Sequence, residues 1–154
     1  MSRRVFVALQ QFCEDTDAPR RVLTSAGFSV AENKLGRRLK REELPELLKE
    51  AEAVIAGLEP FDASVLKALP KLKLISRCGV GTDSIDLEAA KHLGIEVRVT
   101  ADEVTEAVAE ITLAMMLALA RQLPQHAADF LAGKWTKRTG FLLSEWTIGL
   151  IGFG

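Results

Sequence analysis

Five short apolar runs alternate with segments of helical pattern over the first hundred residues, and this alternation constrains the fold more than any other feature. The runs are Arg4 to Leu9, Phe28 to Glu32, Ala53 to Ala56, Leu72 to Ser76 and Glu96 to Val99. Strands that alternate with helices form parallel sheets whose faces are covered by the helices. The chain is therefore predicted to begin with an α/β domain built on a parallel sheet.

The segments between the runs carry residues that begin and end helices. Helices are expected near Thr16 to Ala26, near Glu42 to Glu52, from Asp62 to Leu69 and after Asp86. The last has the strongest signals, because Asp86 suits an N-cap and Gly94 suits a left-handed stop. Five such strand and helix units indicate a flavodoxin-like, doubly wound sheet over residues 1–100.

Residues 101–133 form one long helical pattern, interrupted at Pro124, where a kink or restart is expected. Ile111 to Ala120 is apolar around nearly the whole helix, which is typical of a helix buried on every side. A small domain covers one face of a helix, so a second domain or a second subunit is expected on the other. Residues 101–154 are therefore interpreted as a linker helix and the start of a second domain.

Composition excludes several classes of function. The chain has 154 residues, 48% of them apolar and 27% charged, and a net charge of −1, which is typical of a soluble globular domain. The balanced charge argues against nucleic acid as a partner. The most apolar stretch, Ile111 to Ala120, has half of the roughly 20 residues that a membrane span needs.

The cysteines and histidines indicate no catalytic or metal centre. Cys13 and Cys78 lack paired spacing, which favours free thiols and a cytoplasmic location. No metal-ligand spacing occurs. His92 is best interpreted as a favourable charge at a helix C-terminus, and His126 has no nucleophile near it in the sequence. No catalytic residue is therefore predicted.

A glycine-containing loop follows the fourth apolar run and reads Arg77-Cys-Gly-Val-Gly-Thr-Asp83. Ligands of parallel sheets bind outside the carboxyl ends of the strands. Gly79 and Gly81 allow positive φ and close approach, so the amides around Val80 could converge on an anion beside Arg77. A small carboxylate would fit such a loop. A plain turn with a solvated Arg77 is the alternative that the sequence leaves open.

A second glycine motif ends the sequence. Thr147 to Ile151 reads as an apolar strand that runs into Gly152-Phe153-Gly154, the first two glycines of a dinucleotide fingerprint. The third glycine and the helix of that fingerprint would lie after Gly154, so spacing alone leaves nucleotide binding open. We expect the chain to be a fragment that stops within a Rossmann domain.

Residues 72–97, together with motifs at 105–110, 120–124, 133–135 and 148–154, resemble the D-isomer-specific 2-hydroxyacid dehydrogenases, nearest the phosphoglycerate dehydrogenase branch. The resemblance implies an oxidoreductase that transfers a hydride between NAD, or NADP, and a small D-2-hydroxy acid. It implies that Val80 and Gly81 hold the substrate carboxylate, that Gly152 and Gly154 hold the NAD pyrophosphate, and that Thr105 lies near the nicotinamide.

The resemblance also implies a homodimer formed in part by the long helix. Gly57 occupies a position where the phosphoglycerate branch often has an arginine. The resemblance therefore does not imply that this chain binds a substrate phosphate at that position. The family's catalytic Arg, Glu and His follow the glycine motif, so this chain is expected to be inactive alone. The alternative is a free-standing flavodoxin-like binding or regulatory module that pairs with another chain through its apolar helix.

Overall fold

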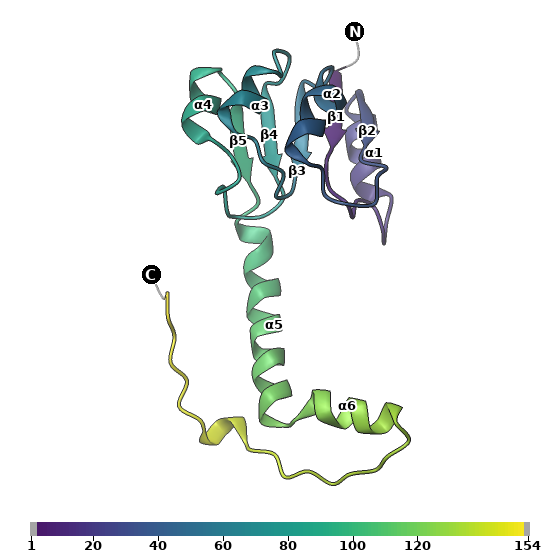
Figure 1. Cartoon of the computed structure of the whole chain (residues 1–154), viewed down its shortest axis with the longest axis vertical. Helices are drawn as coiled ribbons and strands as arrows, with labels where there is room; N and C mark the ends of the chain where they lie inside the picture. The colour runs from purple at the N-terminus through teal and green to yellow at the C-terminus, as the bar shows by residue number, and fades with distance from the viewer. Residues whose placement is uncertain (1–2, 153–154) are drawn as a thin grey trace. The chain divides into compact units, whose positions relative to one another are not determined.

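The computed structural model describes residues 3–152, which divide into two compact units, one ending at Val104 and one beginning at Thr105. The first unit contains a five-stranded sheet whose strands are β1 (Arg3–Val7), β2 (Phe28–Glu32), β3 (Ala53–Ala56), β4 (Leu74–Arg77) and β5 (Glu96–Val99) (Figure 1). All neighbouring strands are parallel and the order is β2-β1-β3-β4-β5. This is the flavodoxin-like order, so the predicted fold class is confirmed.

Four helices accompany this sheet: α1 (Ala18–Ser25), α2 (Leu44–Leu48), α3 (Ala63–Lys67) and α4 (Leu87–His92). A 3-10 turn at Arg41–Glu43 precedes α2, so the helix predicted from Glu42 to Glu52 is shorter than expected. The core lies between the sheet and these helices, and its fully buried side chains include Val7, Val54 and Ile75 from strands and Leu44, Leu48, Phe61 and Leu66 from the connections. Burial of these apolar side chains is what holds the sheet and helices together.

The second unit contains most of α5 (Asp102–Ala120), with α6 (Leu123–Leu131) and a 3-10 turn at Leu143–Glu145. The predicted interruption is real, but it falls at Gln122, whose φ is 51°, and Pro124 lies in the first turn of α6. A proline is tolerated in a first turn because its missing N–H needs no partner there, so the helix breaks before it.

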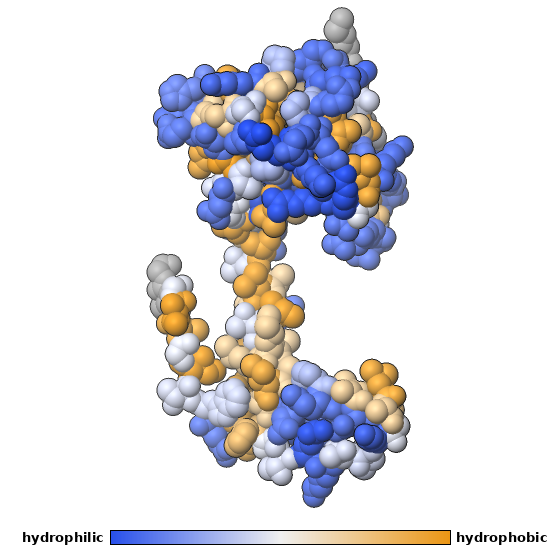
Figure 2. All heavy atoms as spheres, viewed as in Figure 1, coloured by the Kyte–Doolittle hydropathy of each residue, from blue (hydrophilic) through white to orange (hydrophobic). Residues whose placement is uncertain are grey.

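The apolar part of α5 is not covered by residues 3–152. Only Ala120 of this helix is buried, whereas Ile111 is 52% and Leu119 is 70% exposed. Figure 2 shows the hydrophobic side chains along the helix. The described residues therefore do not bury Ile111 to Ala120 on every side, and the covering domain or subunit stays a prediction.

The strand expected from Thr147 to Ile151 is absent, which corrects that part of the prediction. A strand forms by backbone hydrogen bonds to a neighbouring strand, and the described residues of the second unit contain no strand that could pair with it. Across residues 3–152, no helix is both long and apolar enough to cross a membrane.

Candidate functional site

The loop that follows β4 begins at the carboxyl edge of the sheet and is tied to the strands on both sides. The amide of Cys78 donates to the carbonyl of Ala56 at 2.8 Å, at the end of β3. The amide of Gly79 donates to Oγ1 of Thr100 at 2.7 Å, and the amide of Thr100 returns a bond to the Gly79 carbonyl at 3.1 Å. These bonds fix the start of the loop between the ends of three parallel strands.

Arg77 packs across Gly79. The Arg77 side chain is buried, with 9% of the residue exposed, and its Nε donates to the carbonyl of Gly81 at 3.0 Å. Gly79 has φ +129°, and a Cβ there would lie 2.3 Å from an Arg77 guanidinium nitrogen. Only glycine satisfies both conditions, because it tolerates this φ and leaves room for the guanidinium. Arg77 is therefore no solvated surface charge, and the plain-turn alternative is wrong on that point.

The next two amides of the loop are available to a ligand. Neither the Val80 nor the Gly81 amide nitrogen has a hydrogen-bond partner within residues 3–152, and Val80 is 52% exposed. Of the two loop glycines, only Gly79 has a positive φ. Gly81 therefore contributes by lacking a side chain beside the amides, and its backbone conformation does not require glycine. Two exposed amides beside a buried guanidinium make a local environment suited to an anion.

The loop ends against the segment after β3. The amide of Phe61 donates to the Ser84 carbonyl at 2.8 Å, and the amide of Asp86 donates to the Phe61 carbonyl at 2.9 Å. A cavity of about 360 Å³ lies beside these bonds, at the carboxyl edge of the sheet. It is lined by Arg38, Leu58, Arg77, Gly81, Asp83 and Ser84. The structure thus brings two of the predicted site residues, Arg77 and Gly81, to the wall of one small cavity.

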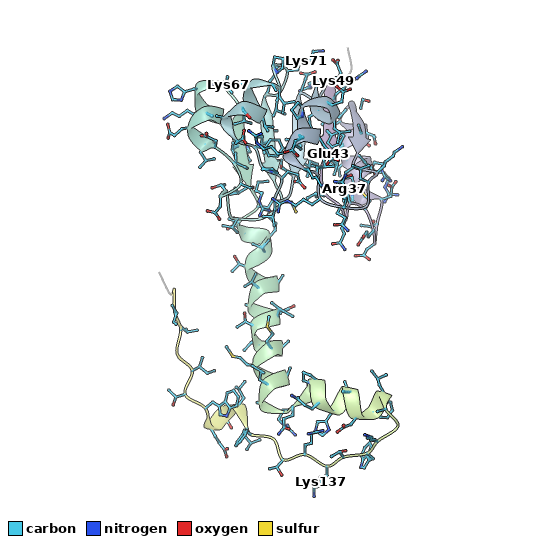
Figure 3. The ribbon with its side chains drawn as sticks, viewed as in Figure 1. Arg37, Glu43, Lys49, Lys67, Lys71 and Lys137 are labelled. Atoms are coloured by element: carbon cyan, nitrogen blue, oxygen red, sulfur yellow. The ribbon has the colours of Figure 1, made fainter. Side chains whose placement is uncertain are left out.

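Sequence reasoning missed Arg38, which lies in the connection from β2 to α2. Its position is fixed by its neighbours, since Leu39 is buried and Nδ2 of Asn33 donates to the Arg37 carbonyl at 2.8 Å. Arg37 and Glu43 form a two-bonded ion pair that closes the same loop (Figure 3). The signal that could have found Arg38 is that connections leaving the carboxyl ends of parallel strands share one edge of the sheet.

The predicted cofactor residues lie in the second unit, and one of them lies outside the described residues. Thr105 is in α5, Gly152 has φ +79° and a Cβ added there would meet nothing within 4 Å, and Gly154 is not described. A pyrophosphate site of the predicted kind needs a strand, a glycine turn and a helix N-terminus. The described residues supply only the turn at Gly152, so they do not fit NAD by themselves. Within those residues, no group of three or more His, Cys, Asp or Glu side chains could hold a metal ion.

Comparison with known proteins identifies relatives of the chain. Residues 11–143 match the family model of the D-isomer specific 2-hydroxyacid dehydrogenase catalytic domain. The chain is 36% identical over 138 residues to the D-3-phosphoglycerate dehydrogenase of Homo sapiens, covering 88% of this chain and 25% of the relative. It is 36% identical over 119 residues to the hydroxypyruvate reductase of Thermotoga maritima, covering 75% of this chain and 39% of the relative.

Solved structures agree with these sequence matches. The NAD⁺-bound 3-phosphoglycerate dehydrogenase of Entamoeba histolytica superposes with a TM-score of 0.69 at 30% identity, covering 79% of this chain and 40% of the other. The TT0316 protein of Thermus thermophilus gives 0.75 at 32% identity, covering 90% and 45%. The chain spans about a quarter of the length of the phosphoglycerate dehydrogenases it matches. Because the family model matches most of its residues, the chain belongs to the D-isomer specific 2-hydroxyacid dehydrogenase family.

Proposed function

We propose that this chain is the substrate-binding part of an oxidoreductase that transfers a hydride between NAD and a small D-2-hydroxy acid. Arg77, Gly79, Val80 and Gly81 hold the carboxylate of that acid. The single observation that carries this assignment is the buried Arg77, packed across Gly79 beside two amides without partners.

The chemistry of the loop suits a carboxylate. An ionised carboxylate accepts several hydrogen bonds at once, and bonds from amides or a guanidinium to a charged acceptor are short and strong. Anchoring of Cys78 and Gly79 to the neighbouring strands fixes these donors before the ligand arrives. Little ordering of the loop is then needed on binding, which favours affinity.

The cofactor supplies the hydride chemistry when it is bound, and Thr105, Gly152 and Gly154 are the residues of this chain proposed to contact it. The described residues do not complete a nucleotide site, so no step of the reaction is assigned to them. The chain alone is proposed to be inactive, to use residues outside it for proton transfer, and to belong to a cytoplasmic homodimer.

The carboxylate site is tested by ligand-dependent stability of the 154-residue chain. We expect millimolar pyruvate, hydroxypyruvate or D-glycerate to raise the thermal denaturation midpoint, because a ligand that binds only the folded state stabilises it by mass action. In Gly81→Val the new Cβ lies in contact with Oδ2 of Asp83 at 3.5 Å and the added methyl groups take up space beside the Val80 and Gly81 amides, so the rise should disappear.

Gly149→Val is the matched control, since a Cβ at Gly149 meets nothing within 4 Å and its backbone is not left-handed. This variant should keep the full ligand-dependent rise. No rise with any of the three acids, or the same rise in Gly81→Val as in the parent chain, would contradict the carboxylate assignment.

A further inference from the structure

Thr100 makes two hydrogen bonds to the first glycine of the site loop. Its Oγ1 accepts from the amide of Gly79 at 2.7 Å, and its own amide donates to the Gly79 carbonyl at 3.1 Å. Thr100 directly follows β5, and Gly79 lies two residues after β4, the strand that pairs with β5 (Figure 1). The two bonds therefore join the segments that leave neighbouring strands at the carboxyl edge of the sheet.

The bond to the Gly79 carbonyl fixes the direction of the next amide. In a planar trans peptide unit the C=O and the N–H point in opposite directions, and the described peptide bonds are all trans. The Gly79 carbonyl is directed toward Thr100, so the Val80 amide of the same peptide unit points away from Thr100. This amide has no hydrogen-bond partner within residues 3–152, and its direction leaves it available to a ligand.

The bond to the Thr100 hydroxyl acts on the peptide unit before Gly79. The Gly79 amide belongs to the unit that joins Gly79 to Cys78, and within residues 3–152 only the Thr100 side chain accepts from this amide. Thr100 thus restrains both peptide units that flank Gly79, one through its side chain and one through its backbone. Thr100 and Gly79 are both half-buried, so water competes less for these bonds than it would at an exposed site.

Gly79 needs such a restraint because nothing in the residue itself limits its backbone. Its φ is +129°, and glycine has more alternative conformations than any other residue. The Arg77 guanidinium occupies the space where a Cβ would lie, so a bulkier residue cannot replace the glycine and stiffen the loop. The restraint has to come from a neighbouring residue, and the Thr100 hydroxyl supplies it.

Arg77 restrains a different part of the same loop. Its Nε donates to the Gly81 carbonyl at 3.0 Å, which directs the peptide unit between Gly81 and Thr82. That unit does not contain the Val80 amide or the Gly81 amide. The direction of the Val80 amide therefore depends on the bonds from Thr100, and the bond from Arg77 cannot replace them.

We propose that Thr100 is a positioning residue for the carboxylate site, whose hydroxyl holds Gly79 so that the Val80 and Gly81 amides face the acid. Thr100 does not itself contact the acid. Loss of the hydroxyl frees the Gly79 amide to turn, and ordering the loop again on binding then reduces affinity. This proposal rests on the proposed carboxylate site and adds to it a residue from the end of the neighbouring strand.

The test is an NMR titration of the 154-residue chain with D-glycerate, followed at the backbone amides. In the parent chain the Val80 and Gly81 amides should shift. Thr100→Val replaces the hydroxyl by a methyl group of similar size and should raise the dissociation constant about fivefold, the equivalent of one neutral hydrogen bond. Thr100→Ser keeps the accepting oxygen and should bind nearly as tightly as the parent chain. Hydrogen exchange of the Gly79 amide should be faster in Thr100→Val than in the parent chain and in Thr100→Ser.

Two further variants separate positioning from folding. Thr100→Ala removes the same oxygen with a smaller side chain and should show the same loss of affinity, so a folding defect in Thr100→Val alone does not decide the result. Thr112→Val is the matched control, since it removes a hydroxyl that donates to the Val108 carbonyl at 2.6 Å in the second unit. This control should bind D-glycerate as the parent chain does.

The outcomes distinguish the role of Thr100 from the carboxylate site. The dissociation constant is measured on the folded chain, so a purely structural Thr100 would change stability and leave that constant as it is. If Gly81→Val abolishes the shifts but Thr100→Val binds as tightly as the parent chain, the role of Thr100 is wrong and the carboxylate site stands. The same holds if Thr100→Ser binds as weakly as Thr100→Val. If D-glycerate shifts neither Val80 nor Gly81 in the parent chain, both proposals are wrong.

Discussion

Glu43 is held by two donors at once. Its carboxylate accepts bonds from the Arg37 guanidinium at 2.5 and 2.9 Å and from the backbone amide of Lys40 at 2.7 Å. The bond from Arg37, followed by the bond from Lys40, lowers the pKa of Glu43 from 4.5 to about 2. This pair closes the connection that carries Arg38, so it bears on the site as well as on stability.

We predict that Glu43 titrates near pH 2 and that Arg37→Gln moves its pKa upward, toward 4.5. Because the pKa is lower in the folded state, the ion pair stabilises the fold above pH 4.5, and that contribution is lost as the pH falls through about 2. Carboxyl chemical shifts in an NMR titration measure the pKa directly. Lys67→Gln, which removes a lysine that forms no ion pair within the described residues, should leave it unchanged. An ordinary pKa in the parent chain would contradict the pairing.

Local sequence patterns reveal only part of the residue-scale site. Gly79, Gly81 and Arg77 could be predicted because they lie within one short loop, where spacing carries the information. Arg38 could not, because it reaches the cavity beside that loop only after the β2 connection folds against the same edge of the sheet. The burial of Arg77 likewise depends on its packing across Gly79, which composition does not express.

Among the elements, α4 follows the site loop directly and depends on its cap. Oδ1 of Asp86 accepts from the amide of Ala89 at 2.9 Å, and Gly94 ends the helix with φ +69°. Both features were predicted from the sequence, because caps are local. We predict that Asp86→Ala lowers the free energy of unfolding by about 1 kcal/mol, the usual cost of losing an N-cap.

Urea denaturation of the parent chain and of three variants measures this effect. Asp86→Asn keeps a capping oxygen and should stay near the parent value. Asp15→Ala, at an exposed aspartate outside any helix, should have little effect. Equal stability of Asp86→Ala and the parent chain would show that the cap does not hold α4.

Elements that depend on distant partners are harder to predict than α4. Thr147 to Ile151 has the apolar composition of a β-strand. It does not form one among the described residues, because a strand needs backbone hydrogen bonds to a neighbouring strand. The helix break shows the same limit on a smaller scale. Pro124 marks an interruption in the sequence, yet the backbone turns two residues earlier, at Gln122.

At the scale of the whole molecule, the exposed apolar side chains of α5 are the feature that indicates a partner. Many of the large apolar side chains of this helix are about half exposed or more, including Ile111 at 52%, Leu113 at 56% and Leu119 at 70%. A contiguous apolar surface of this kind on a folded protein marks an interface. A sequence can reveal that such a helix needs a partner, because apolar residues occur around its whole circumference. These residues do not specify which partner covers them.

We predict that the chain forms a homodimer through α5 and that Leu119→Glu shifts it to monomer. Full burial of one leucine stabilises by roughly 2 kcal/mol, and a two-fold interface loses two such contacts together with the cost of burying two charges. Sedimentation equilibrium across a range of concentrations measures the change. Leu35→Glu, at a half-exposed leucine of the first unit, should leave the dimer intact. A parent chain that is monomeric at every concentration would contradict the homodimer and would leave α5 to be covered by a different chain or domain.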